Sequence, residues 1–115
     1  MNKRVLGEKY EGMAVSFLEG KGVRITDRNY FTRHGEIDLI GRDGDYIVFF
    51  EVKYRSSDKY GHPLEAVTPS KQRSIINASR VYLYEKHISE NSYIRYDCLG
   101  ITGDNIEWLR NAFSL

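Results

Sequence analysis

The chain has 115 residues, a mass of 13.4 kDa and a net charge of +1; with 41% apolar and 29% charged residues, it is not a disordered chain, and one domain over 1–115 is expected. Its single cysteine, Cys98, excludes an intramolecular disulfide and a multi-cysteine zinc site, and it fits a reducing cytoplasm. The start of the chain is too polar for a signal peptide and no apolar run reaches the ~20 residues of a membrane helix, so we expect a cytoplasmic protein without a membrane partner.

The first half of the chain predicts a helix followed by three strands, because apolar residues first recur at helical spacing and then fall into short runs. The predicted elements are a helix over 5–20 and strands over 23–31, 35–42 and 46–54. The last of these strands is apolar on both alternating faces, which is typical of the centre of a sheet. Before it, Asp43-Gly44 favours a tight hairpin turn over residues 42–45.

The second half predicts a loop, a helix and a pair of strands. The hydroxyl of Thr68 is placed to cap a helix that starts at Pro69. The predicted elements are a loop over 55–68, a helix to about Lys86, strands over 93–101 and 106–109, and a turn over 102–105. The order α-β-β-β-α-β-β is typical of an α/β (α+β) fold in which helices cover a sheet.

Two charged residues end the most apolar strand. Because side chains alternate along a strand, Glu51 and Lys53 emerge on the same face, roughly 6–7 Å apart. An isolated buried charge there would cost several kcal/mol. Either the strand has reached solvent at this point, or the pair has a chemical role. A second Glu-x-Lys triplet, Glu19-Gly20-Lys21, sits at a helix end and is interpreted as plain surface.

The predicted hairpin brings a further acid toward this pair. With the turn centred near Gly44, Asp38 faces position 50 or 51 of the next strand. Two neighbouring carboxylates repel unless they share a proton or a cation, and oxygen ligands suit Mg²⁺ or Mn²⁺. Such an ion could activate water beside a phosphate, with Lys53 orienting the water or offsetting charge. A coincidence at a solvated strand end is the alternative.

Other candidates carry weaker signals. Glu11 borders the apolar stripe of the first helix, where it is either an acid that reaches over the sheet or a simple boundary residue. Lys71 and Gln72 start the second helix on its sheet-facing side, and helix-start solvation explains them equally well. Three histidines, His34, His62 and His87, lack the spacing of metal ligands. Cys98 is expected to pack in the core. For Tyr30, Tyr54 and Tyr60, packing is expected by default, and stacking on bases is the alternative.

Charge is unevenly distributed along the chain. Residues 53–80 contain six basic and two acidic residues, a net charge of +4, while the rest of the chain is negative overall. A basic segment suits a phosphate backbone, and an ordinary surface of mixed charges is the alternative.

Several motifs carry a resemblance to a known family. They are Glu11-x-x-Ala14-x-x-x-Leu18, Arg28-Asn29, Gly35-Glu36-Ile37-Asp38-Leu39-Ile40, Phe50-Glu51-Val52-Lys53-x-Arg55, Ala66-Val67, Lys71 and Arg95-x-Asp97. In this order they resemble the YraN-like family of bacterial proteins over nearly the whole chain. That family is similar to restriction-endonuclease-like nucleases of the PD-(D/E)xK type, and archaeal Holliday-junction resolvases share the motif layout. Tyr10 and Phe50 depart from residues common in the family, and neither is a presumed ligand.

The resemblance implies a restriction-endonuclease-like core with α-β-β-β-α-β order and a central mixed sheet flanked by helices. It implies Asp38 and Glu51 as metal ligands, Lys53 as the catalytic lysine and Glu11 as an accessory acid. Gln72, next to the matching Lys71, is compared with a polar helix residue of related nucleases.

These expectations lead to a functional hypothesis with rivals. The leading hypothesis is a Mg²⁺- or Mn²⁺-dependent endonuclease that hydrolyses phosphodiester bonds in DNA, including branched or structured DNA, and that could act as a homodimer. The residues expected to contact nucleic acid are Arg55, Lys71, Gln72 and Arg73. The alternatives are a non-catalytic nucleic-acid-binding module with the same fold and a protein-interaction subunit. The spacing of the residues does not distinguish DNA from RNA.

Overall fold

The computed structural model describes residues 3–55, 67–89 and 91–114, and within them the predicted order of helices and strands is confirmed. The elements are α1 (Lys3–Gly20), β1 (Arg24–Thr32), β2 (Gly35–Asp43), β3 (Tyr46–Arg55), α2 (Pro69–Glu85), β4 (Ile94–Thr102) and β5 (Asn105–Phe113). The fold is α+β, as predicted. Most of the predicted loop over 55–68 lies outside the described residues. Neither helix in the described part of the chain is long and apolar enough to cross a membrane.

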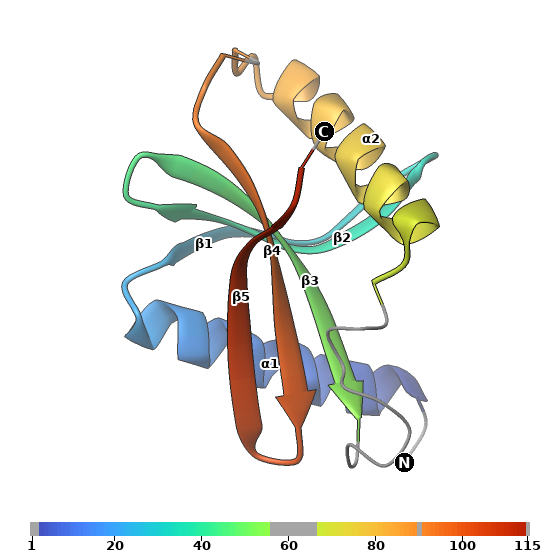
Figure 1. The fold of residues 1–115 in the computed structure, drawn as a ribbon, viewed down its shortest axis with the longest axis vertical. Coiled ribbons are helices and arrows are strands. Elements are labelled where there is room, and N and C mark those ends of the chain that lie inside the picture. The colour runs from blue at the N-terminus through green and yellow to red at the C-terminus, as the bar shows by residue number, and fades with distance from the viewer. Residues whose placement is uncertain (1–2, 56–66, 90, 115) are drawn as a thin grey trace.

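The five strands form one mixed sheet in the order β1-β2-β3-β4-β5 (Figure 1). Only β3 and β4 run parallel, because the chain between them passes through α2; the other neighbouring strands are antiparallel. The expectation that 46–54 is a central strand is therefore confirmed. Residues 47–50 of β3 are at most 2% exposed, since both faces of the sheet are covered at this point.

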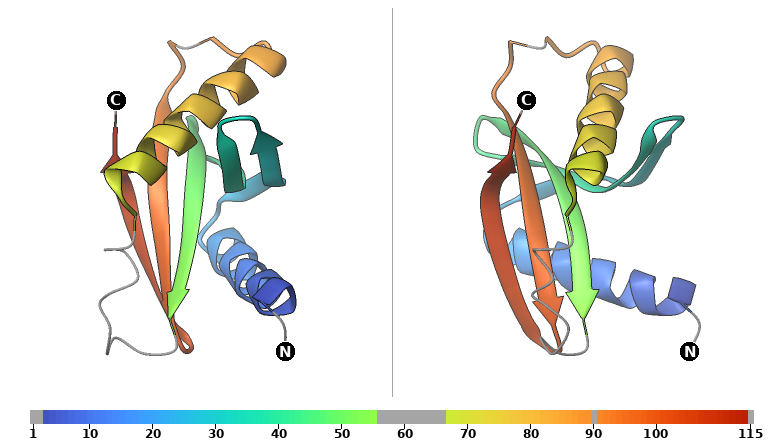
Figure 2. Two further views of the ribbon diagram at one scale, coloured as in Figure 1. Left: turned by 90° about the vertical axis from the view of Figure 1, so that its right-hand side faces the viewer. Right: turned by 45° about the vertical axis from the view of Figure 1, so that its right-hand side comes forward.

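The two helices pack on opposite faces of the sheet, and successive residues of β3 belong to different layers of the core. Phe49 packs with Ile75 and Leu83 of α2, whereas Phe50 packs with the layer formed by α1. Figures 1 and 2 show α2 against the upper part of the strands and α1 behind their lower part. The middle of β3 lies between the two helices (Figure 1), which gives its side chains access to groups from both.

Two local signals in the sequence are confirmed by the backbone. The side chain of Thr68 caps α2 by accepting a hydrogen bond from the Lys71 backbone N–H at 3.2 Å, and Pro69 occupies the first turn. Between β2 and β3, Gly44 adopts the left-handed conformation (φ 60°) that the tight turn requires. The turn pairs Asp43 with Tyr46, and this fixes the register of the whole β2–β3 hairpin.

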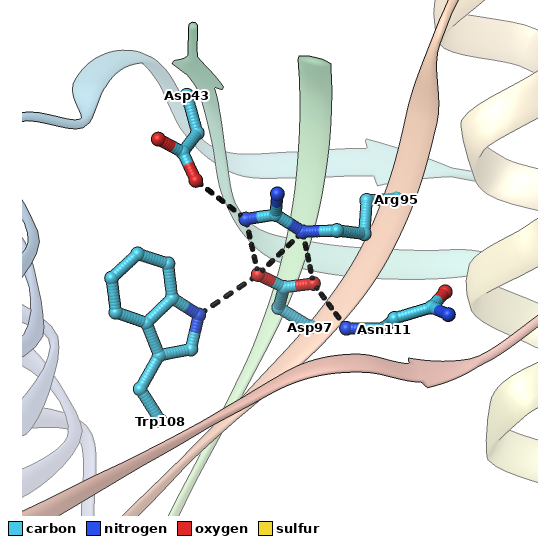
Figure 3. A network of polar contacts seen from close by, with 5 residues as sticks. All are labelled: Asp43, Arg95, Asp97, Trp108 and Asn111. Carbon is cyan, nitrogen blue, oxygen red and sulfur yellow. Dashed lines mark hydrogen bonds and ion pairs between the residues drawn. The ribbon is translucent and has the colours of Figure 1, made fainter.

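Strand β5 is longer than predicted, and a buried aspartate explains why. The strand continues to Phe113 instead of ending near 109, because a bulge shifts its register and brings Phe113 onto the ring of Tyr96. Asn111 in this bulge has a φ of 53°, and its N–H donates to Asp97 at 2.9 Å (Figure 3). The alternation of apolar and polar residues is lost at a bulge, so the sequence pattern predicted that the strand ends too early.

The carboxylate of Asp97 is the centre of the network in Figure 3 and is completely buried. It accepts hydrogen bonds from Arg95 Nε at 2.9 Å and from the Trp108 indole N–H at 2.8 Å. Arg95 also bonds Asp43 at 2.7 Å. The Arg95-x-Asp97 motif therefore ties β4 to β5 and to the β2–β3 turn. Because the donors to the Asp97 carboxylate all belong to β4 and β5, this motif has a structural role.

Candidate active site

Asp38 lies where β2 parts from β3. The last paired residues of the β2–β3 ladder are Leu39 and Phe50, which confirms the register predicted for Asp38. Beyond this pair, Asp38 Oδ2 accepts a hydrogen bond from the backbone N–H of Val52 at 2.8 Å. The carboxylate thus takes the place of a ladder carbonyl and is held firmly against β3.

Glu51 lies beside Asp38 and is one of the few buried acids in the described part of the chain, with 3% of its surface exposed. Burial, followed by the nearby charge of Asp38, raises the pKa of Glu51 to about 8. Burial also raises the pKa of Asp38, although the hydrogen bond from Val52 opposes this shift. The two carboxyl groups are joined by a hydrogen bond that favours the proton on Glu51. Near neutral pH they therefore share one proton.

Two lysines approach Glu51 from different elements. Lys53 Nζ, two residues further along β3, is 3.6 Å from Oε1, and Lys71 Nζ, from the first turn of α2, is 3.9 Å from Oε2. Both distances exceed those of normal hydrogen bonds, and both lysine side chains are about one-third exposed. The ammonium groups therefore offset the charge of Glu51 without being locked onto it.

Two further acids extend this group. Glu11 reaches it from α1, beside the buried Ala14 and Leu18, and burial is the main reason that its pKa is raised. Glu36, on β2, also has a pKa raised by burial and then by Asp38 and Glu11. We refer to Glu11, Glu36, Asp38, Glu51, Lys53 and Lys71 as the carboxylate–lysine cluster.

Asn29 is a supporting residue: it belongs to the Arg28-Asn29 motif of the sequence, but the motif alone assigned it no role. The neighbouring pairs Arg28–Leu39 and Tyr30–Ile37 place Asn29 opposite Asp38 on β1. Its φ of 53° is rare for a residue with a side chain, and Asn is one of the few residues that tolerate it. The Asn29 amide is hydrogen bonded to the Glu11 carboxylate and lowers its pKa. Asn29 thus ties α1 to the strand that carries Asp38.

The cluster fits a divalent cation of the hard, oxygen-seeking type. Glu11 Oε1 and Glu51 Oε2 are buried oxygen atoms without a hydrogen-bond partner. Within 3–55, 67–89 and 91–114, no three acidic, imidazole or thiol groups form a ready-made metal site. Mg²⁺ commonly binds through one or two carboxylates while water and phosphate oxygens complete its shell, so the pair Asp38 and Glu51 is a sufficient protein contribution.

The other predicted site residues lie outside the cluster. Gln72 donates to the carbonyl of Val67 at 3.2 Å. Arg73 is exposed beside a groove of about 380 Å³ that Asn77, Arg80 and Ser114 also line. Arg55 is exposed and lines a hollow of about 230 Å³ with Lys53. All three lie within two residues of Lys53 or Lys71 in the sequence. Within the described part of the chain, none of them forms a hydrogen bond or ion pair with the acids of the cluster.

The remaining minor candidates mostly pack as expected. Cys98 is buried in the core beside α2, and burial raises its pKa to about 12, so it stays a neutral thiol. Tyr54 stacks on Tyr10, with ring centroids 4.3 Å apart, and Tyr30 meets Tyr82 edge to face. His34 is half-buried in the β1–β2 turn. His62 and Tyr60 lie outside the described residues, as does part of the basic segment 53–80.

Comparison with known proteins places this arrangement in a family. Residues 10–101 match the model of Uncharacterised protein family UPF0102. A UPF0102 protein of Nitrosococcus oceani is 43% identical over 111 residues, covering 93% of this chain and 90% of the relative. Others from Chromohalobacter salexigens and Vibrio parahaemolyticus are 43% and 40% identical and cover 97% and 98% of this chain, and 93% and 95% of their own.

The chain belongs to UPF0102. This is the YraN-like family that the sequence motifs indicated. The segment matched by the UPF0102 model contains every member of the carboxylate–lysine cluster and ends within β4, before β5 begins. The cluster is therefore part of the region that relates this chain to the family.

The shared proton predicts an unusual pH dependence of stability for this UPF0102 protein. Because the folded pKa of Glu51 lies near 8 and its ordinary value is 4.5, the folded state holds a proton that the unfolded chain releases. The stabilisation is complete below pH 4.5 and is lost as the pH rises through 8, by at most about 5 kcal/mol. Without divalent cations, the melting temperature of the wild type should fall between pH 5 and 9 relative to that of Glu51→Gln. Glu19→Gln, at the exposed end of α1, should follow the wild type; parallel curves for wild type and Glu51→Gln would contradict the shared proton.

The role of Asn29 predicts different effects for two substitutions. Asn29→Ala should lower the free energy of unfolding by about 1–2 kcal/mol, because alanine is strained at a φ of 53°. Asn29→Gly accepts this backbone and should retain most of the stability. In both variants the pKa of Glu11, followed by carbon-13 NMR, should rise because the carboxylate loses its amide donor. An unchanged Glu11 pKa would show that Asn29 does not position this acid.

Proposed function

We propose that this protein is a metal-dependent endonuclease that hydrolyses phosphodiester bonds in DNA at the carboxylate–lysine cluster. The observation that carries the proposal is the pair formed by the half-buried Asp38 and the buried Glu51, held across two strands, with Lys53 emerging two residues beyond Glu51. The resemblance of these motifs to PD-(D/E)xK nucleases supports the same assignment.

Asp38 and Glu51 would hold Mg²⁺ or Mn²⁺, and Glu11 would contribute from α1 through its unpartnered oxygen. When bound, the cation would polarise the scissile phosphate and acidify a water molecule. Glu51 must give up the shared proton to act as a ligand, and the nearby lysines assist by stabilising the resulting carboxylate. The raised pKa of Glu51 therefore predicts weaker activity toward acid pH.

Lys53 and Lys71 are suited to binding a phosphate because they are charged, partly exposed and held only loosely by Glu51. Lys53 can orient the attacking water or offset the charge that develops on the phosphate oxygens. Lys71 starts α2, where the helix N-terminus also favours an anion. Both lysines approach the same acid, so one phosphate group could contact both.

The wider basic surface would hold the DNA backbone. Arg55 continues β3 beyond Lys53, and Arg73 and Arg80 lie on exposed positions of α2. These residues could neutralise phosphates on either side of the cluster, and binding would then weaken as salt is added. Gln72, beside the groove, would add a neutral contact.

A non-catalytic nucleic-acid-binding module is the second candidate. It is favoured by one observation: within the described residues, no group of three potential ligands forms a complete metal site. In such a module the acids would maintain the local structure, while the basic surface would still bind DNA. The two functions differ in whether the bound DNA is cut.

A cleavage assay on labelled duplex, single-stranded, flap and four-way-junction DNA with Mg²⁺, Mn²⁺ or EDTA distinguishes them. We expect metal-dependent products from the wild type and a loss of at least about a hundredfold in Asp38→Asn and Lys53→Ala, because positioned acids and charges typically contribute this much. Lys21→Ala, which removes an exposed lysine after α1, should cut normally. Gel shifts without cleavage by the folded wild type would establish the binding module instead, and unchanged cleavage in both site variants would refute the assigned residues.

A further inference from the structure

The β1–β2 hairpin exposes a phenylalanine close to its tip. Phe31 has 73% of its surface exposed, although its hydrocarbon side chain cannot form hydrogen bonds with water. Its neighbour Tyr30 points the other way and meets the Tyr82 ring of α2 at a centroid distance of 5.2 Å. The end of this hairpin lies beside α2 and stands away from β3, β4 and β5 (Figure 2). The Phe31 ring is thus presented to the surroundings while the other side of the hairpin is anchored.

The tip that carries this ring is ordered by its own hydrogen bonds. Thr32 Oγ1 accepts from the His34 N–H and donates to the Gly35 carbonyl, both at 3.0 Å. Arg33 is exposed between them, with its Nε 3.4 Å from His34 Nε2. A hydrophobic ring and a cation are therefore displayed together on a short, internally bonded turn. Fixing the ring in advance lowers the entropy lost when a ligand covers it.

The register of the hairpin places the ring beside the carboxylate–lysine cluster. Phe31 pairs with Glu36, and directly paired residues in an antiparallel ladder share one face. The pKa of Glu36 responds to Asp38, Glu11 and Lys71. The Phe31 ring therefore lies at the rim of the cluster, one cross-strand neighbour away from its acids.

An exposed aromatic ring with a nearby cation is the combination by which proteins bind single-stranded nucleic acid, since every base has a face that can stack. Bases inside a continuous duplex are already stacked on both sides and cannot reach such a ring without unpairing. An unpaired base can. The position of the ring then determines where that base lies relative to the phosphate at the cluster.

We infer that Phe31 is the base-stacking site for an unpaired nucleotide next to the phosphate that is cut, with Arg33 contacting the adjoining backbone. The inference rests on the proposed nuclease function and narrows its substrate to single-stranded DNA or to DNA with an unpaired base at a branch. Continuous duplex lacks the nucleotide that this site accepts.

Binding measured in EDTA tests the site independently of cleavage. The probes are a single strand and a flap that carry 2-aminopurine, and a continuous duplex of the same sequence. Phe31→Ala should weaken binding of the single strand and flap about five- to a hundredfold and abolish the stacking-dependent quenching of 2-aminopurine, because one base stack contributes this range. Phe31→Trp should retain both signals, Phe31→Leu should lose the quenching, and duplex binding should change little in any variant.

Tyr93→Ala is the matched control, because Tyr93 is 64% exposed just before β4, beside Tyr46 at the other end of β3 from Lys53. It should behave like the wild type. Equal effects of Phe31→Ala on all three probes, equal quenching in Phe31→Leu, or no single-strand binding by the wild type would overturn the inference. So would a change in sedimentation of the protein alone without loss of quenching, which would make Phe31 a contact between copies of the chain. Quenching that depends on Phe31, together with no cleavage in Mg²⁺, would support the stacking site and refute the nuclease function. Cleavage at the same rate with and without Phe31 would support the nuclease function and refute the stacking site.

Discussion

The carboxyl groups of the half-buried Asp38 and the buried Glu51 meet, and without a compensating cation their desolvation and mutual repulsion keep a proton on the pair. Their proximity follows from the backbone: β2 separates from β3 after Leu39, and Asp38 bonds the Val52 N–H that the departing strand leaves without a partner. Displacing either acid would require a change in the hairpin register. The repulsion between the two carboxylates in their ionised forms therefore follows from the β2–β3 register, and groups from the rest of the fold surround the pair.

The groups around the pair come from both sides of the sheet. Lys71 approaches from α2 and Glu11 from α1, because the middle of β3 lies between helices that pack on opposite faces. Asn29, opposite Asp38 on β1, connects these layers through Glu11. On the neighbouring strand β4, the buried carboxylate of Asp97 is satisfied entirely by donors within the protein. Asp97 has all its hydrogen-bond partners within the protein, whereas Glu51 Oε2 has no hydrogen-bond partner and only the loose ion pair with Lys71 at 3.9 Å.

Much of this could be predicted from the sequence because it depends on local rules. Asp43-Gly44 determined the turn, the turn determined the register, and the register placed Asp38 beside Glu51. Thr68-Pro69 likewise marked the start of α2, which positions Lys71. The role of Asn29 could not be predicted, because its positive φ and its bond to Glu11 arise from tertiary structure. Glu36 had a usable signal, since it alternates with Asp38 on β2, but its neighbours belong to α1 and α2. The bulge at Asn111 depends on the distant Asp97 and so escaped the strand pattern.

Binding of Mn²⁺ followed by electron paramagnetic resonance tests most directly whether the cluster is a cation site. The wild type should deplete the signal of free Mn²⁺ at pH 8, and Glu51→Gln and Asp38→Asn should leave it largely undiminished, because each variant lacks one of the two proposed carboxylate ligands. Glu19→Gln should bind as the wild type does. A wild-type protein that leaves free Mn²⁺ unchanged, or site variants that bind it equally well, would contradict the assignment of Asp38 and Glu51 as the metal ligands.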